Sequence, residues 1–337
     1  MSTPISERAA KLHRDALVWD MTFPMMDEGG SDVAHAPLRR MADAGVDFVS
    51  VTVALDWDGT AEAVRSIARE RAYFIAHSDR YVLVEQADDV LTAKQTARLA
   101  VALHFQGTNP VEYDLNMIEV YHRLGVRHML MAYNAKNAVG DGWIEEGNGG
   151  LSRFGRALIG EMNRVGMLVD ASHTGYRTTM EMFEVSSDPV IFSHANARAL
   201  WVHGRNISDE QITACARSGG VVGVVGVNLF LGQGDPSPEA LFRHIDYIAD
   251  RAGPEHVGLG LDYVADQVAL TATINARAAW TPPSESFGPI EPLAVRYSQP
   301  EELPALTELM LARGYSEANV RGILGENWLR VARRVWG

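Results

Sequence analysis

Eight short runs of apolar, β-prone residues recur along the chain, and this repetition constrains the fold more than any other feature. The runs cover residues 16–22, 46–55, 99–106, 128–134, 166–173, 189–194, 221–228 and 257–263. They are almost continuously hydrophobic rather than alternating, as expected for parallel strands that are covered on both faces. Amphipathic stretches long enough for a helix lie between most of them, which indicates βαβ units. Eight such units favour an α/β fold of the closed (β/α)8, TIM-like barrel type over an open sheet.

Local signals support the helices, and two long connections stand out. Ser208 and Gln211 form a capping box, and Gly219 ends the helix that they begin. Residues 1–337 are predicted to form a single barrel domain, because such barrels routinely use this much chain. Residues 137–150 and 264–299 follow the fourth and eighth runs, so they belong at the C-terminal face of the barrel, where we expect lid-like loops.

The charge and the cysteine content limit the kinds of binding partner and the cellular compartment that we expect for this protein. Thirty basic against 43 acidic residues give a formal net charge of −13. Acids and bases are interspersed, whereas a nucleic-acid-binding surface needs clustered Lys and Arg. Cys215 is the single cysteine, which excludes an intramolecular disulfide and suits a reducing compartment. No apolar run approaches the ~20 residues of a membrane span, so we expect a cytoplasmic protein without nucleic-acid or membrane partners.

Polar residues end most of the predicted strands, and in a barrel these ends converge on one cavity. They are Asp20, Thr22, Asp56, His104, Gln106, Tyr133, Asn134, Asp170, His173, His194, Asn228 and Asp262. Buried polar side chains need partners or a chemical role. This set is therefore the source of the candidate site residues.

His173 and His194 are the strongest metal candidates. They lie in "DASHTG" (170–175) and "FSHANARA" (192–199), each just past an apolar run. Successive barrel strands are neighbours, so the two imidazoles can meet and bind one divalent metal as neutral donors. The alternative is that each is a hydrogen-bonded histidine at a strand end.

Other polar residues suggest acid–base and binding roles. Asp262 in "GLGLDY" is a candidate general acid or base, and Arg205 in "HGRNISDE" suits a substrate carboxylate. Tyr133 is a candidate hydrogen-bond donor to an oxyanion. His104 and Gln106 are two apart on one strand, so both side chains share a face. Ion pairs, packing or a hydrogen-bonded polar layer are the alternatives for these residues.

Several long stretches together resemble one known family. They include "LGVRHMLMAYNAKN", "GGLSRFGRALIGEMNRVGMLVDASHTG", "PVIFSHANARAL", "RNISDEQI", "HIDYIADRAGPEHVGLGLDY" and "RGYSEANVRGILGENWLRV". Over nearly the whole chain the sequence resembles the renal (membrane) dipeptidase family, peptidase family M19. The resemblance implies a distorted (β/α)8 barrel, a homodimer, and hydrolysis of dipeptides at a binuclear zinc centre.

The family's functional residues are only partly kept. The resemblance matches His173 and His194 to the two histidines of the second metal site. It matches Arg205 to the arginine that holds the substrate carboxylate and Asp262 to the aspartate near the reacting centre. Tyr133 and Asn134 would contact the substrate beside them.

Other positions depart from the family's pattern. Thr22 and Pro24 stand where the first strand should supply His-x-Asp, Gln106 replaces the bridging glutamate, and Tyr133 replaces a histidine. These replacements remove the charge that neutralises two dications, so a binuclear zinc centre is not expected. One metal, zinc or alternatively iron or manganese, is expected at His173 and His194, with Gln106 and Asp20 as further ligands. A metal-free site is the alternative.

Three functions follow from these observations. The first is a dipeptidase-like, metal-dependent hydrolase of a small amide, with an altered metal site. The second is a lyase or isomerase on the same scaffold that transfers protons through Asp262, Tyr133 and His104. The third is a non-catalytic binder. In each case the ligand is a small molecule that carries a carboxylate.

Overall fold

The computed structural model describes residues 4–24, 30–277 and 295–336, and its strands form one parallel sheet. The strands are β1 (Trp19–Pro24), β2 (Phe48–Leu55), β3 (Tyr81–Leu83), β4 (Leu99–Gln106), β5 (Val126–Leu130), β6 (Leu168–Asp170), β7 (Val190–Ile191), β8 (Val222–Val224) and β9 (Val257–Leu259). Their order is β7-β6-β5-β4-β2-β1-β9-β8, and β3 pairs with β4 outside this path. All printed pairings between strands are parallel, as the runs of apolar residues predict.

The sheet closes into a barrel between β7 and β8. Phe192, just after β7, forms a parallel bridge with Val222 of β8. The Phe192 amide donates to the Val221 carbonyl at 3.0 Å, and the Gly223 amide donates to the Phe192 carbonyl at 2.7 Å. The predicted (β/α)8 barrel is therefore confirmed.

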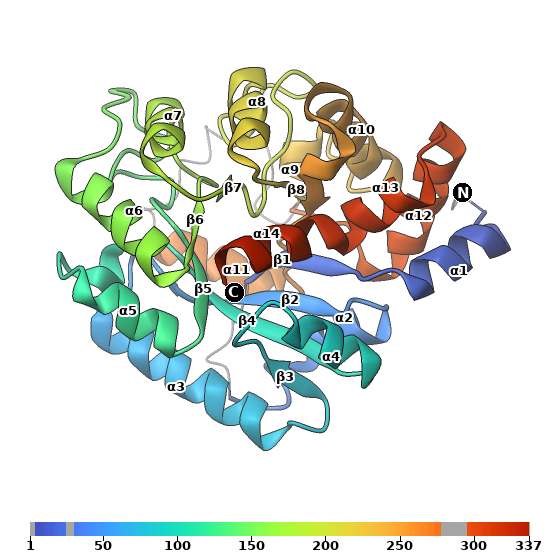
Figure 1. Ribbon diagram of the computed structural model, residues 1–337, viewed down its shortest axis with the longest axis horizontal. Coiled ribbons are helices and arrows are strands. Elements are labelled where there is room, and N and C mark those ends of the chain that lie inside the picture. Colours follow the sequence, from blue (N-terminus) through green and yellow to red (C-terminus); the bar gives the residue numbers. More distant parts are fainter. Residues whose placement is uncertain (1–3, 25–29, 278–294, 337) are drawn as a thin grey trace.

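Helices surround the strands, as Figure 1 shows. They are α1 (Glu7–Asp15), α2 (Ala36–Asp43), α3 (Thr60–Ala76), α4 (Asp89–Gln95), α5 (Asn116–Arg123), α6 (Arg153–Val165), α7 (Tyr176–Val185), α8 (Asp209–Ser218), α9 (Asn228–Leu231), α10 (Pro238–Ala252), α11 (Gln267–Ala276), α12 (Leu303–Arg313), α13 (Glu317–Arg321) and α14 (Asn327–Val335). The capping box of Ser208 and Gln211 is present at the start of α8, and Gly219 ends that helix at φ 83°. Within the described part of the chain, no helix has the length and apolar character that crossing a membrane requires.

The N-terminal end of the barrel is filled by aromatic side chains. Trp19 of β1 stacks on Phe48 of β2 with ring centroids 3.8 Å apart, and Trp336 packs against both. Trp328 is buried in the same cluster. This apolar floor leaves the polar residues of the strands to the middle and the C-terminal end of the barrel.

Five of the observed strands, β5 to β9, end earlier than the sequence predicts. The predicted runs reach residues 134, 173, 194, 228 and 263, whereas β5 to β9 end at Leu130, Asp170, Ile191, Val224 and Leu259. The chain leaves the sheet at these points to place side chains over the barrel mouth. The short strand β3 was not predicted, because it adds only three residues to the outside of β4.

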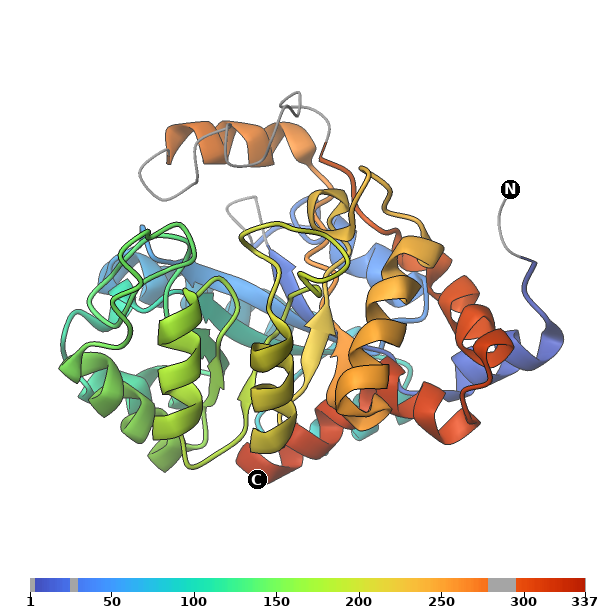
Figure 2. The ribbon, with the colours of Figure 1, turned by 90° about the horizontal axis from the view of Figure 1, so that it is seen from above.

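The described parts of the two long connections lie at the barrel mouth, and a role as lids stays a prediction. Residues 137–150 pack on the loop after β6 through the Gly142–Thr174 bridge. The 264–299 connection contains α11, which Figure 2 shows above the C-terminal ends of the strands. Its residues 278–294 lie outside the described part of the chain.

Candidate functional site

Three of the predicted site residues adopt left-handed backbone conformations directly after their strands. Asn134 has φ 60°, His173 φ 66° and Asp262 φ 56°. Such a conformation is unfavourable for residues other than glycine and persists where the surrounding structure imposes it, often at functional sites. The strain turns each chain segment sharply, so that the side chains lie at the barrel mouth instead of continuing along the sheet.

The predicted pairing of His173 with His194 is present. The two Nε2 atoms lie 2.7 Å apart, within hydrogen-bonding distance. Hydroxyls of Ser193 and Thr22 lie 2.8 and 3.1 Å from His194 Nδ1, and Asn134 Oδ1 lies 2.6 Å from His173 Nδ1.

These contacts fix where the ring protons of the pair lie. Trp143 Nε1 also donates to Asn134 Oδ1, so this oxygen is an acceptor and His173 Nδ1 carries a proton. His173 Nε2 is then an acceptor, and His194 Nε2 donates to it. Burial lowers the pKa of His173 well below its usual value and that of His194 to about 3, so both rings are neutral.

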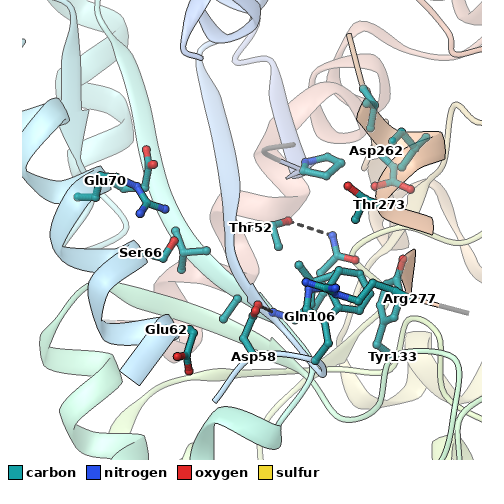
Figure 3. Close-up of a pocket in the computed structure, with 18 of the residues that line it drawn as sticks. Thr52, Asp58, Glu62, Ser66, Glu70, Gln106, Tyr133, Asp262, Thr273 and Arg277 are labelled. Carbon is teal, nitrogen blue, oxygen red and sulfur yellow. Dashed lines mark hydrogen bonds between the residues drawn. The ribbon is translucent and has the colours of Figure 1, made fainter. Parts of the chain in front are cut away.

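Two pockets flank this pair. The first, which we call the mouth pocket, has a volume of about 560 Å³, and Figure 3 shows its residues. Thr52, Gln106, Tyr133 and Asp262 line it, together with side chains of α3 and α11. The second, the side pocket, has a volume of about 570 Å³ and is lined by His173, Arg205 and the 143–148 segment.

A stacked pair of rings stands between the two pockets. The Tyr133 ring lines the mouth pocket and stacks on the His173 ring, which lines the side pocket, with centroids 4.5 Å apart. Gln106, Tyr133 and Asp262 therefore face the mouth pocket and His173 faces the side pocket, so the predicted residues do not converge on the single cavity that the sequence suggests.

Asp262 and Arg205 perturb each other across this region. Burial raises the pKa of Asp262 to about 7, although the Arg205 guanidinium lowers it. Burial lowers the pKa of Arg205 to about 10, still far above neutral pH. One Arg205 nitrogen, Nη2, donates to the His194 carbonyl at 3.2 Å, while its Nε has no hydrogen-bond partner among the described residues. A buried, partly unsatisfied guanidinium is suited to binding an anionic group.

The other predicted metal ligands have partners within the protein. Gln106 Nε2 donates to Thr52 Oγ1 at 3.0 Å. Asp20 Oδ1 accepts from the backbone amides of Leu261 and Thr22, at 2.8 and 3.3 Å. Thr22 itself hydrogen-bonds to His194, in the place where the family pattern would have a metal ligand. Metal binding by Gln106 and Asp20 stays a prediction.

The described residues do not fit a binuclear zinc centre. Two nitrogens bound tetrahedrally to one zinc at about 2.0–2.1 Å lie about 3.3 Å apart, whereas the two Nε2 atoms are 2.7 Å apart and hydrogen-bonded. In residues 4–24, 30–277 and 295–336, no three or more His, Cys, Asp or Glu side chains are grouped to hold a metal ion. Neutral groups contact the pair instead, because Thr22 hydrogen-bonds to His194 and Tyr133 stacks on His173.

Sequence reasoning missed several polar residues behind the site. Ser50, Thr52 and His128 connect His104 and Gln106 to Asp170 through buried hydrogen bonds. The signal was present, because Ser50 and Thr52 alternate with valines in "VSVTVAL" and so share one face of β2. Asp56, which we expected at a strand end, accepts hydrogen bonds from the backbone amides of Tyr133, Thr108 and Asn109.

The closed barrel of parallel strands places this chain among the (β/α)8-barrel proteins. Within that class, the model of the membrane dipeptidase family (peptidase family M19) matches residues 10–273. The chain belongs to this family, and the resemblance seen in the sequence is confirmed.

Relatives and solved structures agree with this assignment. Dipeptidase verJ of Clonostachys rogersoniana is 30% identical over 257 residues, which cover 76% of this chain but 60% of verJ. Dipeptidase tcpJ of Claviceps purpurea is 31% identical over 343 residues, 96% of this chain and 74% of tcpJ. The crystal structure of an amidohydrolase from Pseudomonas aeruginosa superposes with a TM-score of 0.87 at 31% identity and covers 98% of this chain and 99% of its own.

Proposed function

We propose that this protein is an acid–base enzyme on the membrane dipeptidase scaffold, which acts on a small molecule carrying a carboxylate and does not use a binuclear zinc centre. One observation carries the proposal. Where the resemblance would have two histidines bind the second metal, His173 and His194 bind each other. Neutral side chains replace the charged ligands beside them, so the centre has lost the donors that would neutralise two dications.

The remaining polar groups support proton transfer. Asp262, with a pKa of about 7, exchanges protons readily near neutral pH. Tyr133 lines the same pocket, and its hydroxyl is suited to donating a hydrogen bond to a substrate oxygen. Arg205, with Asn134 beside it, is proposed to hold the substrate carboxylate, because its guanidinium is buried and has a free Nε donor among the described residues.

Hydrolysis of a dipeptide or related amide is the second candidate, and family membership favours it. The relatives verJ and tcpJ are named dipeptidases. This candidate requires one divalent metal, zinc or alternatively iron or manganese, at His173 and His194. It therefore requires the imidazole pair to separate and further ligands to approach. A homodimer and a cytoplasmic location remain predictions.

Metal analysis and a substrate panel distinguish the two candidates. The protein is purified without a His-tag, its transition metals are quantified, and L-L and L-D dipeptides are assayed with and without added Zn or Mn. We expect below about a tenth of an equivalent of any metal, because a pair of neutral imidazoles alone holds a dication weakly. We also expect no metal-stimulated turnover.

Robust turnover that zinc or manganese stimulates would overturn the proposal and establish the second candidate. In that case the His173→Gln variant loses activity. The matched variant His256→Gln retains it, because His256 lies near the opposite end of the barrel, before β9, and bonds the Gly220 carbonyl.

A further inference from the structure

A continuous chain of hydrogen bonds runs through the barrel interior from the mouth pocket to a buried carboxylate. Its members, in order, are Gln106, Thr52, His104, Ser50, His128 and Asp170. The successive links measure 3.0, 3.0, 3.0, 2.9 and 3.2 Å. All six side chains are buried, and they come from the adjacent strands β2, β4, β5 and β6. We call this set the interior chain.

The chemistry of the links fixes the direction of every hydrogen bond. Because a carboxylate only accepts, His128 Nδ1 donates to Asp170, and Nε2 of the neutral ring accepts from Ser50. The Ser50 proton is then used, so Ser50 Oγ accepts from His104 Nδ1, and His104 Nε2 accepts from Thr52. Gln106 Nε2, which can only donate, bonds to Thr52 Oγ1.

The far end of the interior chain is a carboxylate that stays ionised. His128 Nδ1 donates to Asp170 Oδ2, and the backbone amides of Ser172 and Ser193 donate to Oδ1 at 2.9 and 3.1 Å. Burial acts to raise the pKa of Asp170, but the hydrogen bond from His128 and the charge interactions with His128 and His194 outweigh it and lower the pKa to about 2. The interior chain thus begins at a pocket wall and ends at a fixed negative charge.

We propose that the interior chain is a directional proton relay, which moves a proton between the mouth pocket and the buried His128–Asp170 pair. This role rests on the proposed acid–base function. A base in the pocket wall can act repeatedly only if the proton that it receives can leave the reacting atoms. Thr52 and Gln106 line the pocket at the end of the interior chain, so a proton can enter the relay there. Figure 3 shows Thr52 and Gln106 joined by a hydrogen bond at that wall.

The transfer balances without any further reactant. A proton that arrives at Thr52 Oγ1 displaces the hydroxyl proton to His104 Nε2, and the His104 Nδ1 proton passes to Ser50. Ser50 then gives its own proton to His128 Nε2. The net result is one proton lost from the pocket and one gained by His128, which becomes an imidazolium beside the Asp170 carboxylate. His104, Ser50, His128 and Asp170 are positioning residues, because none of them lines the mouth pocket.

A structural polar layer would show the same static hydrogen bonds, so the test must detect proton movement. We would measure solvent exchange of the His104 and His128 ring N–H protons by NMR on protein labelled with ¹⁵N-histidine, without any substrate. The backbone amides of His104 in β4 and His128 in β5 carry the same label and report ordinary opening of the barrel. In a relay, the His104 Nδ1 proton exchanges faster than these amides, because it is handed on to Ser50 without opening. The His128 Nδ1 proton is not handed on, so it should follow the amides.

Two substitutions cut the interior chain at different points. Thr52→Val removes the hydroxyl at the pocket end and should slow the exchange of the His104 Nδ1 proton, by about tenfold or more, toward the rate of barrel opening. Ser50→Ala removes the group that accepts this proton and should slow its exchange by a similar factor. Thr307→Val is the matched control, because Thr307 is buried and bonds to His13 Nδ1 at 2.9 Å outside the interior chain.

His104 ring exchange that follows the labelled backbone amides in the unmodified protein, or that neither substitution slows, would overturn the relay. The same holds if Thr307→Val has an equal effect. If Thr52→Val does not fold, the exchange of the His104 ring proton in Ser50→Ala decides the question. Because no substrate enters this measurement, failure of the relay is distinguishable from failure of the proposed function, which the dipeptide and metal assays test.

Discussion

Among single residues, Asp20 shows most directly how burial sets the chemistry at the barrel mouth. Its Oδ1 accepts two backbone hydrogen bonds, while Oδ2 is buried without a partner among the described residues. Burial, with a smaller contribution from the nearby Asp262 charge, raises the pKa of this carboxyl to about 7, although the two backbone hydrogen bonds lower it. A buried carboxyl with one free oxygen prefers to be protonated, because only the ionised form needs the missing solvent.

This raised pKa predicts a pH-dependent cost to stability that Asp20→Asn should remove. Between pH 4 and 7 the unfolded chain releases the proton and the folded chain keeps it, so stability falls as pH rises through this window. The loss is at most about 4 kcal/mol, from roughly 3 pKa units at about 1.4 kcal/mol each. Asparagine keeps the Oδ1 acceptor and cannot ionise. Urea unfolding should show Asp20→Asn more stable than the unmodified protein at pH 8 and equal to it at pH 4.

The exposed residue Asp79 provides the control, and Asp79→Asn should change stability at neither pH. An Asp20→Asn difference that is the same at pH 4 and pH 8 would contradict the raised pKa.

Residue types and strand ends were enough to predict that His173 and His194 lie together, but not how the polar side chains around them pair. The sequence places His173 and His194 on neighbouring strands, and they do meet. It does not show that Tyr133 stacks on His173 and so stands between Asp262 and Arg205. Ring stacking and the left-handed conformations at Asn134, His173 and Asp262 depend on tertiary contacts that local patterns do not contain.

At the scale of elements, the connection after β5 depends on one carboxylate from the end of β2. Asp56 Oδ1 accepts from the amides of Thr108 and Asn109, at 2.8 and 3.0 Å. Its Oδ2 accepts from the Tyr133 amide at 2.7 Å and from Asn137 Nδ2 at 3.0 Å. Both oxygens face donors only, so this side chain holds the β4 and β5 connections together and positions Tyr133.

The substitution Asp56→Asn should therefore destabilise the protein, because its amide group would face N–H donors on one side. Leaving buried donors unpaired costs about 1–3 kcal/mol each, so urea unfolding at pH 7 should show a loss of about 2–4 kcal/mol. Asp58→Asn is the matched control. Asp58 Oδ2 accepts from the Leu55 amide, which an amide oxygen can also do, so we expect a loss below about 1 kcal/mol. Equal losses in the two variants would show that Asp56 does not hold these connections.

The hydrophobic runs predicted which segments form the barrel strands, but they did not predict where several of these strands end. The runs gave all eight barrel strands in order, because burial on both faces leaves a clear signal. The strand ends were predicted too long, since residues such as Ala171, Phe192 and Val225 are apolar and buried but lie outside the ladders. A run of apolar residues reports burial, and it does not report where backbone pairing stops.

For the whole molecule, the closing contact of the barrel lies beside the single cysteine. Cys215 of α8 is completely buried, and its Sγ lies 3.4 Å from the carbonyl oxygen of Val190 in β7. The Phe192–Val222 bridge that joins β7 to β8 follows directly. Burial raises the pKa of the Cys215 thiol, so the reactive thiolate is scarce in the folded protein.

Thiol labelling at Cys215 should consequently report opening of the entire barrel. If β7 and β8 separate only when the barrel unfolds, labelling with a disulfide reagent in native buffer should be slower than that of a free thiol by at least about a thousandfold. The rate should rise with urea in parallel with global unfolding measured by circular dichroism. Ser187→Cys, at an exposed position just before β7, serves as the control and should react at the rate of an unprotected thiol.

Fast labelling of Cys215 that does not depend on urea would mean that the contact between β7 and β8 opens locally. The two hydrogen bonds between these strands, at 3.0 and 2.7 Å, would then not be enough to keep the barrel closed.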